Sequence, residues 1–345
     1  MRATTTTRAR YNSWVMNTTL AENTQGNLAP IGVFDSGFGG LTVAHEITRA
    51  LPQESIIYVG DSARCPYGPR SLAQVEGFVE QIGTWLMSQG VKLIVIACNT
   101  ATAAGLQRAR ELFPVPVIGV IEPGARAAAH TTRNRRVGVI ATRATIDSNA
   151  YTNAIRALDE EITVFATATP RFVDIAEQGI RLAEGPMEDY MSLASKVYVR
   201  PEFHHIAQEY LEPLRRCGID TLVLGCTHFP LLKAMIGSTV GHQVTLISSA
   251  TETARDVVRI LEERGLSAPT DALSGAQGDA LSGAHSGAQG DTRSGAQPCV
   301  QANAQPGAQA KYRFYTTGTD VREFKAFGSR VFCEPLEFVE HLDLV

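Results

Sequence analysis

The sequence lacks the features that mark several large classes of protein. It has no run approaching the roughly 20 consecutive apolar residues of a membrane-spanning helix, which excludes an integral membrane protein. It has no excess of positive charge, because 31 Lys and Arg stand against 35 Asp and Glu, unlike a general nucleic-acid binder. Its 6 cysteines form no Cys-x-x-Cys pair, which argues against a zinc ribbon, a thioredoxin-like redox turn and a disulfide scaffold.

Two segments differ from the rest of the chain. Residues 1–29 are rich in Thr and have no apolar run of a secretory signal, so we expect a disordered leader, with Met16 as an alternative start. Residues 267–310 repeat Ser-Gly-Ala-Gln-Gly-Asp at 274–279 and 286–291, and they contain no aromatic residue. Such a composition cannot bury enough apolar surface to offset the entropy of ordering it. We therefore predict a disordered insertion over 267–310.

The remainder alternates short β-branched apolar runs with amphipathic stretches. The predicted strands are 31–34, 55–60, 92–97, 115–121, 136–141, 162–168, 221–225, 243–248 and 312–316. The predicted helices include 41–50, 71–89, 101–112, 147–159 and 251–264. This alternation is typical of an α/β fold with mainly parallel sheets.

The chain also repeats itself. The run Ile-Gly-Val-Phe at 31–34 resembles Val-Gly-Val-Ile at 137–140, and the apolar run ending at Cys98 resembles the one ending at Cys226. Each half therefore places a cysteine at the carboxyl end of a strand, where ligands of open α/β sheets bind. If the two halves face each other, one crevice receives both cysteines.

Cys98 and Cys226 are the strongest candidates for chemistry. Cys98 precedes Asn-Thr and Cys226 precedes Thr-His, so each thiol has hydrogen-bonding neighbours. One strand-end cysteine is usually structural, whereas two in matched contexts favour a shared function. Two facing thiols can invert a stereocentre, since a thiolate removes a proton from one face and a thiol delivers one to the other. A cysteine protease is disfavoured because it has no use for the second cysteine.

A glycine-rich turn, Asp-Ser-Gly-Phe-Gly-Gly, follows the first predicted strand at 35–40. It is a near miss for the dinucleotide fingerprint, with Asp61 where a ribose-binding acid would lie. The third glycine is absent, and Asp35 would place a negative charge at the pyrophosphate position, so a nucleotide site is disfavoured. The N–H groups of the turn could instead hold a carboxylate. The loop 61–70, which contains Cys65, is a further candidate to line the crevice.

His228 lies two residues after Cys226. A Cys-x-His pair suggests zinc, but no further clustered ligands complete a site. Beside a cysteine that handles protons, a histidine can orient or deprotonate the thiol. Asp35 suits the same task beside the other thiol.

Several of these elements resemble bacterial glutamate racemase, of the aspartate/glutamate racemase family. The segments that carry the resemblance are Gly-Val-Phe-Asp-Ser-Gly-Phe-Gly-Gly at 32–40, Gly-Asp-Ser-Ala-Arg-Cys-Pro-Tyr-Gly-Pro-Arg at 60–70, Ile-Ala-Cys-Asn-Thr-Ala-Thr at 96–102, Val-Ile-Gly-Val-Ile-Glu-Pro-Gly at 117–124 and Leu-Gly-Cys-Thr-His-Phe-Pro-Leu at 224–231. The resemblance implies two pseudo-symmetric flavodoxin-like α/β domains with the active site in the crevice between them. We expect the first domain at 30–122 plus 247–345 and the second at 123–246.

The resemblance also implies roles for individual residues. Cys98 would handle the proton on D-glutamate and Cys226 the proton on L-glutamate. Further catalytic roles would fall to Asp35, His228 and Glu177, the last of which follows Pro-Arg-Phe-Val at 170–173. The implied substrate-binding residues are Asp35, Ser36, Tyr67, Gly68, Asn99, Thr100, Thr142, Thr145, Thr227 and His228. No cofactor and no metal are expected.

The implied function is an isomerase that interconverts L- and D-glutamate in the cytoplasm and supplies D-glutamate for peptidoglycan, and thus for cell-wall biogenesis and cell shape. The expected partners are glutamate and a second copy of the chain in a homodimer, with no membrane and no direct nucleic-acid contact. Two alternatives stay open: a racemase of the same fold that acts on aspartate or another amino acid, and a non-catalytic role in binding a partner protein.

Overall fold

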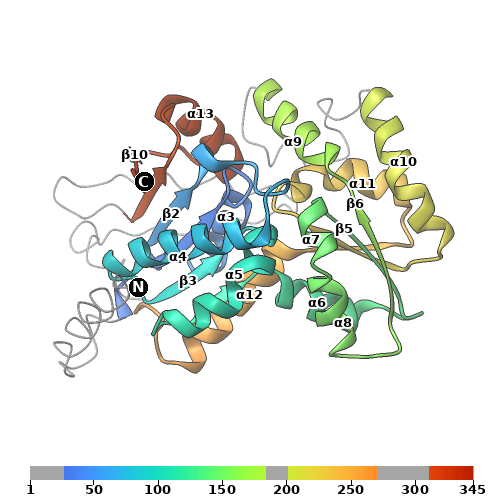
Figure 1. Ribbon diagram of the computed structural model, residues 1–345, viewed down its shortest axis with the longest axis horizontal. Coiled ribbons are helices and arrows are strands. Elements are labelled where there is room, and N and C mark those ends of the chain that lie inside the picture. Colours follow the sequence, from blue (N-terminus) through green and yellow to red (C-terminus); the bar gives the residue numbers. More distant parts are fainter. Residues whose placement is uncertain (1–26, 184–200, 270–310, 345) are drawn as a thin grey trace, which may run out of the picture.

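The computed structural model describes residues 27–183, 201–269 and 311–344, which form two lobes side by side (Figure 1). The predicted leader at 1–29 and the predicted insertion at 267–310 lie almost wholly outside the described residues. The exceptions are residues 27–29 and 267–269: the Asn27 carbonyl accepts from Lys92 Nζ at 2.6 Å, and the buried Ala268 donates its N–H to Glu54 at 2.8 Å.

The first lobe is built on a six-stranded sheet with the order β10-β9-β2-β1-β3-β4 and parallel pairing throughout. Its strands are β1 (Ile31–Asp35), β2 (Ile56–Gly60), β3 (Leu93–Ile96), β4 (Val117–Gly119), β9 (Tyr312–Thr316) and β10 (Val339–His341). Every residue of β1, β2 and β3 is buried. Burial on both faces explains why these strands are continuous apolar runs rather than alternating ones.

The second lobe repeats the central part of the first. Its parallel sheet has the order β6-β5-β7-β8, which corresponds to β2-β1-β3-β4. The strands are β5 (Arg136–Ala141), β6 (Thr163–Ala168), β7 (Thr221–Gly225) and β8 (Thr245–Ser248). The predicted parallel α/β fold with two related halves is therefore confirmed, and its strand order is flavodoxin-like. β8 extends to Ser248, two residues beyond the boundary expected between 246 and 247.

Helices cover the two sheets (Figure 1). They are α3 (Leu41–Ala50), α4 (Leu72–Ser88), α5 (Asn99–Leu112), α6 (Ile121–Thr131), α7 (Arg143–Asp147), α8 (Ala150–Arg156), α9 (Arg171–Leu182), α10 (Pro201–Arg216), α11 (Lys233–Val240), α12 (Ser249–Glu263) and α13 (Val321–Phe332), with short 3₁₀ helices η1 (Ser62–Arg64) and η3 (Phe229–Leu232). α12 follows the last strand of the second sheet and packs against α3 and α6, which ties the lobes together. None of the helices in the described ranges is long and apolar enough to cross a membrane.

One predicted helix begins too early. The helix expected over 147–159 is α8, which begins at Ala150, because Asn149 before it has a left-handed backbone with φ of 56° and Asp147 is the last residue of α7. An α-helix cannot pass through such a residue, and Asn tolerates this conformation better than most residues do. Cys333 ends α13 with the same kind of backbone, at φ of 61°.

Candidate active site

Cys98 and Cys226 line the same cavity, whose volume is about 650 Å³. Cys98 follows β3 and Cys226 follows β7, its counterpart in the second sheet. Both side chains are buried, at 6% and 5% exposure. The strand order reverses between β1 and β3 in the first sheet and between β5 and β7 in the second. The cavity therefore lies at the switch points where doubly wound folds bind ligands.

Most of the predicted substrate-binding residues also line this cavity. They are Ser36, Tyr67, Gly68, Asn99, Thr100, Thr142, Thr227 and His228. Asp35, Thr145 and Glu177 do not belong to the lining, and each contacts a lining residue or turn from behind. The structure therefore places these three where they can act through other groups.

Cys98 is the N-cap residue of α5. Its Sγ accepts a hydrogen bond from the Ala101 N–H at 3.4 Å and lies 3.9 Å from Ser36 Oγ. Burial raises the pKa of the Cys98 thiol well above its ordinary value, and the nearby Asp35 carboxylate raises it further. These effects outweigh the opposing contributions of the contacts with Ala101 and Ser36, which favours the neutral thiol of Cys98, the form that delivers a proton.

Asp35 is fully buried beneath the glycine-rich turn. Its Oδ2 accepts hydrogen bonds from the N–H groups of Gly37 at 3.2 Å and Gly40 at 2.9 Å. The carboxylate held by this turn is therefore that of Asp35 itself, and these two donors are not free for a phosphate. Gly40 has no room for a side chain, because a Cβ there would lie 2.3 Å from the Cβ of Asp35.

Cys226 has a different set of neighbours. Its Sγ lies 3.8 Å from His228 Nδ1, and His228 Nε2 lies 3.5 Å from Oε1 of Glu177 on α9. Burial disfavours a proton on His228, but the contacts with Cys226 and Glu177 outweigh burial and raise the pKa of His228 well above its ordinary value. The interaction with His228 lowers the pKa of Glu177 despite its partial burial. The result is an imidazolium–carboxylate pair directly behind the sulfur.

Threonine hydroxyls join the lobes at one wall of the cavity. Thr100 Oγ1, on α5 of the first lobe, lies 2.9 Å from the hydroxyl of Thr142 and 3.3 Å from that of Thr145. Thr142 and Thr145 are themselves 3.0 Å apart. Thr145 therefore orients the other two hydroxyls rather than facing the cavity.

The glycine-rich turn of the first lobe touches the second lobe at the strand end that carries Cys226. A Cβ on Gly39 would lie 2.4 Å from Thr227 Oγ1 and 2.6 Å from His228 Nδ1, so only glycine fits. Thr42 Oγ1 lies 3.0 Å from the carbonyl oxygen of Thr227. This contact fixes the distance between the two halves of the site.

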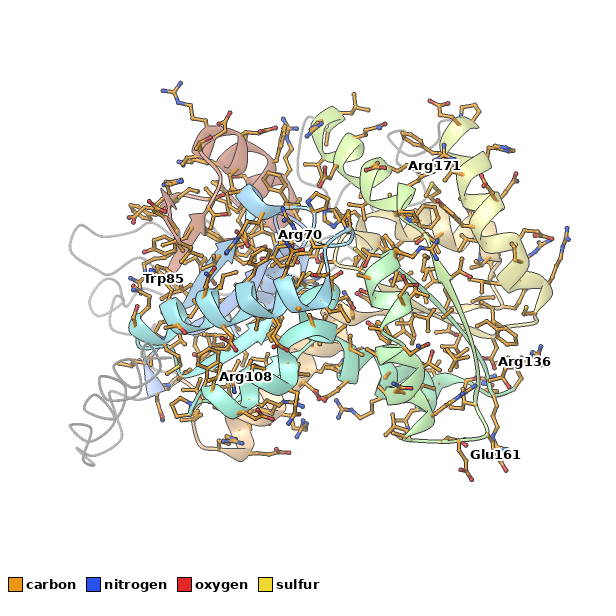
Figure 2. All side chains as sticks on the ribbon, in the orientation of Figure 1. Arg70, Trp85, Arg108, Arg136, Glu161 and Arg171 are labelled. Carbon is orange, nitrogen blue, oxygen red and sulfur yellow. The ribbon has the colours of Figure 1, made fainter. Side chains whose placement is uncertain are left out.

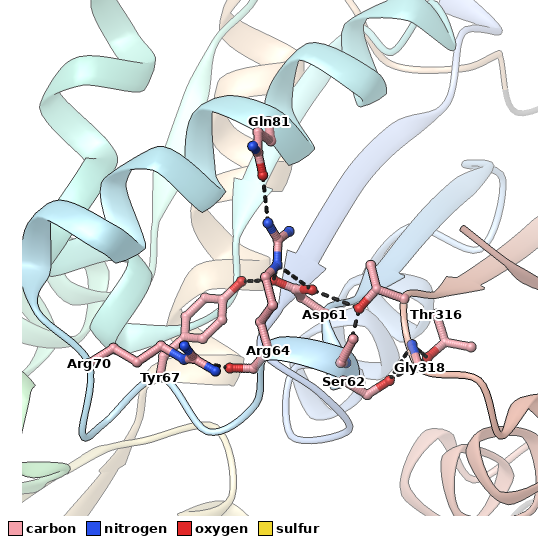
Figure 3. Close-up of polar contacts among 10 residues, drawn as sticks. Asp61, Ser62, Arg64, Tyr67, Arg70, Gln81, Thr316 and Gly318 are labelled. Carbon is pink, nitrogen blue, oxygen red and sulfur yellow. Dashed lines mark hydrogen bonds and ion pairs between the residues drawn. The ribbon is translucent and has the colours of Figure 1, made fainter. Parts of the chain in front are cut away.

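Asp61 is the centre of a polar network beneath the loop that carries Tyr67 (Figure 3). Its carboxylate accepts hydrogen bonds from Arg64 Nε at 2.7 and 2.9 Å, from Thr317 Oγ1 at 2.7 Å and from the Tyr67 hydroxyl. Arg64 is held in turn by Gln81 at 2.5 Å. Both carboxylate oxygens are satisfied internally, so Asp61 is not available to a ribose. A nucleotide site is therefore excluded by the partners of Asp61 as well as by the glycine-rich turn, whose N–H groups bind Asp35.

Sequence reasoning missed several groups in or beside the cavity. Arg70 and Arg143 line it, and Arg70 lies where the two lobes meet (Figure 2). Arg143 lies between Thr142 and Thr145 in the chain, and both threonines were predicted to bind the substrate, so its position could have indicated that it lies near the cavity. Arg70 belongs to the motif at 60–70, which could have indicated the same for it.

Cys65 is a third thiol in the cavity, as its loop predicted. Burial raises the pKa of Cys65 to about 12, and the carboxylates of Glu177 and Asp35 add to the effect. Cys65 is therefore a neutral thiol at physiological pH. Among the residues that the structure describes, no group of three or more His, Cys, Asp or Glu side chains could hold a metal ion, and the Cys226–His228 pair is not extended into a zinc site.

Comparisons with known proteins agree with this geometry. Residues 31–257 match the family described as Asp/Glu/Hydantoin racemase. The chain is 51% identical over 246 residues to glutamate racemase from Mycobacterium ulcerans (strain Agy99), covering 71% of this chain and 84% of that protein. Its structure resembles glutamate racemase isoform RacE1 from Bacillus anthracis, with a TM-score of 0.72, 38% identity and coverage of 92% of this chain and 98% of that one.

A second solved structure is similar: glutamate racemase from Francisella tularensis subsp. tularensis SCHU S4 in complex with D-glutamate. Its TM-score is 0.70 at 30% identity, and the match covers 92% of this chain and 98% of that one. The family match spans well over half of the chain and includes both strand-end cysteines. The chain is thus a member of the Asp/Glu/hydantoin racemase family and, as such, a racemase of the isomerase class.

Proposed function

We propose that this protein interconverts L- and D-glutamate by two-base proton transfer at Cα, with Cys98 and Cys226 as the two bases. The observation that carries the proposal is that two buried thiols, from equivalent strand ends of two related lobes, line one cavity. The relatives named above are glutamate racemases, and one of them binds D-glutamate in its crystal.

The reaction balances with no added reagent. A thiolate on one face of the substrate removes the α-proton, and the thiol on the other face delivers its own proton to the resulting carbanion. One C–H bond breaks and another forms, the configuration inverts, and the two cysteines exchange protonation states. Burial and the Asp35 carboxylate favour the neutral form of Cys98, so Cys98 is suited to deliver the proton when L-glutamate is converted.

The cavity also offers groups to stabilise the carbanion. Charge that develops at Cα spreads onto the α-carboxylate, so donors around that carboxylate lower the barrier. Asn99 Nδ2 is buried with no hydrogen-bond partner among the described residues, and the hydroxyls of Thr100 and Thr227 are close by. Arg70 and Arg143 in the cavity wall favour a substrate with a second carboxylate over a neutral amino acid.

Asp35 and Glu177 lie behind the cavity wall, and in the proposed mechanism each controls the charge near one of the two cysteines. In our interpretation the substrate ammonium offsets the negative charge of Asp35, which makes ionisation of Cys98 easier once the substrate is bound. Glu177 keeps His228 protonated, so that a positive charge faces any negative charge on the Cys226 sulfur.

The direct test is to incubate each pure enantiomer with the enzyme in deuterated water. Circular dichroism then follows racemisation, and proton NMR follows loss of the Cα–H signal. We expect equal final amounts of the enantiomers and deuterium at Cα in the product. Racemisation without deuterium at Cα contradicts the two-base mechanism. A panel with aspartate and neutral amino acids distinguishes glutamate from the alternative substrates.

We further propose that the protein acts in the cytoplasm, as a homodimer, to supply D-glutamate for peptidoglycan. The expected result is rescue of a D-glutamate auxotroph by the wild-type gene but not by a Cys98→Ala variant. Light scattering of the purified protein measures its oligomeric state. Growth of the auxotroph on the inactive variant contradicts the biosynthetic role.

A further inference from the structure

Tyr151 is a buried residue that none of the motifs includes. It lies on α8 in the second lobe and is only 2% exposed. Its hydroxyl donates a hydrogen bond to Oδ1 of Asn99 in the first lobe, at 2.7 Å. Asn99 directly follows Cys98, so a side chain of one lobe reaches the strand end that carries the cysteine of the other.

The ring of Tyr151 contacts the second cysteine-bearing strand end as well. A Cβ on Gly225, the residue before Cys226, would lie 2.9 Å from the ring. The glycine at 225 thus allows the ring to pack on the backbone next to Cys226 while its hydroxyl reaches the residue next to Cys98.

The hydrogen bond determines which way the Asn99 carboxamide faces. The Tyr151 hydroxyl donates to Oδ1 at 2.7 Å, so the NH₂ group of the carboxamide points elsewhere. Burial raises the pKa of the Tyr151 phenol well above its ordinary value, so the proton needed for this bond is retained. Asn99 Nδ2 is buried with no partner among the described residues, and Asn99 lines the cavity.

We propose that Tyr151 is a positioning residue that fixes the Asn99 carboxamide with its N–H groups aimed at the carboxylate of the bound amino acid. This inference rests on the proposed function for the identity of that ligand. It predicts that the Tyr151 hydroxyl contributes to turnover only through Asn99.

The test is a double-mutant cycle with Tyr151→Phe and Asn99→Ala. We expect Tyr151→Phe to lower kcat/KM for both glutamate enantiomers about tenfold, the size of effect that loss of one oriented hydrogen bond produces. In the Asn99→Ala background the same substitution should change kcat/KM less than about twofold. Tyr210→Phe is the matched control and should leave kcat/KM unchanged, because Tyr210 lies on α10, packs against Phe172 of α9 and does not line the cavity.

Additive effects of the two substitutions overturn the inference, as does a Tyr151→Phe enzyme within twofold of wild type. A crystal structure of Tyr151→Phe provides a readout that does not depend on activity. We expect the Asn99 carboxamide to rotate or to occupy two orientations, and a single unchanged orientation contradicts the inference. If the wild-type enzyme racemises no glutamate, the proposed function fails, while this structural readout still decides the role of Tyr151.

Discussion

The two cysteine-bearing strand ends occupy equivalent positions in their sheets, but their surroundings differ in charge. Cys98 is the N-cap of α5, a helix of 14 residues, and its neighbour Asp35 is a buried carboxylate. Cys226 precedes a 3₁₀ helix of only 4 residues, and its neighbour His228 is paired with Glu177. Anionic character surrounds one thiol, and a protonated imidazole stands behind the other.

This difference shows that a repeated fold can place two identical groups without giving them identical chemistry. Strand order and strand-end position follow from the shared topology, whereas charge follows from the few side chains packed behind each sulfur. A two-base reaction benefits from this arrangement, because one thiol must hold a proton while its partner lacks one. The following predictions test the comparison, beginning with the largest expected effect.

Removing either cysteine should abolish racemisation. We expect Cys98→Ala and Cys226→Ala each to lower kcat by about 10²- to 10⁴-fold, the usual contribution of one general acid or base. Hydrogen–deuterium exchange measured separately on each enantiomer should then differ between the variants. Cys226→Ala should retain some exchange on D-glutamate, and Cys98→Ala some on L-glutamate. The opposite pattern would reverse the assignment of faces, and wild-type rates in either variant would refute both roles.

Glu177→Gln should impair only the proton transfer carried out by Cys226. We expect kcat to fall about tenfold, because a neutral amide supports the imidazolium of His228 less well. The matched control is Glu209→Gln, in an exposed ion pair with Arg171, which should leave kcat unchanged. Equal effects of the two substitutions would argue against a specific role for Glu177.

The free energy of unfolding of the same Glu177→Gln variant should differ from that of the wild type in a defined pH range. The pKa of His228 is raised from 6.5, so its stabilising contribution is complete below that pH and is lost as the pH rises through the folded-state value. The pKa of Glu177 is lowered from 4.5, so its contribution is complete above that pH and is lost as the pH falls through the folded-state value. Denaturant titrations should therefore show the largest difference from wild type between pH 4.5 and 6.5, at about 1–2 kcal/mol.

Asp35→Asn should change the protonation of Cys98. Removal of the buried negative charge lowers the pKa of Cys98, so its alkylation by iodoacetamide should begin at a lower pH than in the wild type. The rate is measured by mass spectrometry of the Cys98 peptide across pH 7–10, with Cys217 as the internal reference. An unchanged profile for Cys98 would show that Asp35 does not control its proton.

Replacing residues 270–310 with a short Gly-Ser linker should have the smallest effect, less than about twofold on kcat/KM. The described flanks of this segment lie at the amino ends of the strands: Lys92 Nζ donates to the Leu266 carbonyl at 2.8 Å, and the Lys311 carbonyl accepts from Ile56 N–H. Both cysteines lie at the opposite, carboxyl edge of the sheets. A large loss of activity, with an unchanged melting temperature, would refute the prediction that the segment is dispensable.

Local sequence pattern predicted most of the fold. All nine predicted strands overlap observed ones, because buried parallel strands are short apolar runs that stand out between helices. β10 was missed because it has three residues, of which Glu340 and His341 are exposed. The break between α7 and α8 depends on one backbone conformation at Asn149, which apolar periodicity does not report.

The candidate site was predictable where its residues belong to motifs. The cysteines, the Asp35 turn and the Thr-His pair all directly follow apolar strands, so their position at one sheet edge could be inferred. The function of Asp61 could not, because its partner Thr317 lies 256 residues away in the chain. Tyr151 was missed for the same reason, since its contact with Asn99 spans the two lobes.

The sequence by itself determined the two parallel sheets, the repeat between them and the presence of a cysteine at the carboxyl end of a strand in each. These features depend on local periodicity and on short motifs. Only the tertiary structure decided that both cysteines line one cavity, that Tyr151 joins their strand ends, and that the two thiols differ in electrostatic surroundings. Burial and the charges packed behind each sulfur set these properties, and they arise from contacts between segments that are distant in the chain.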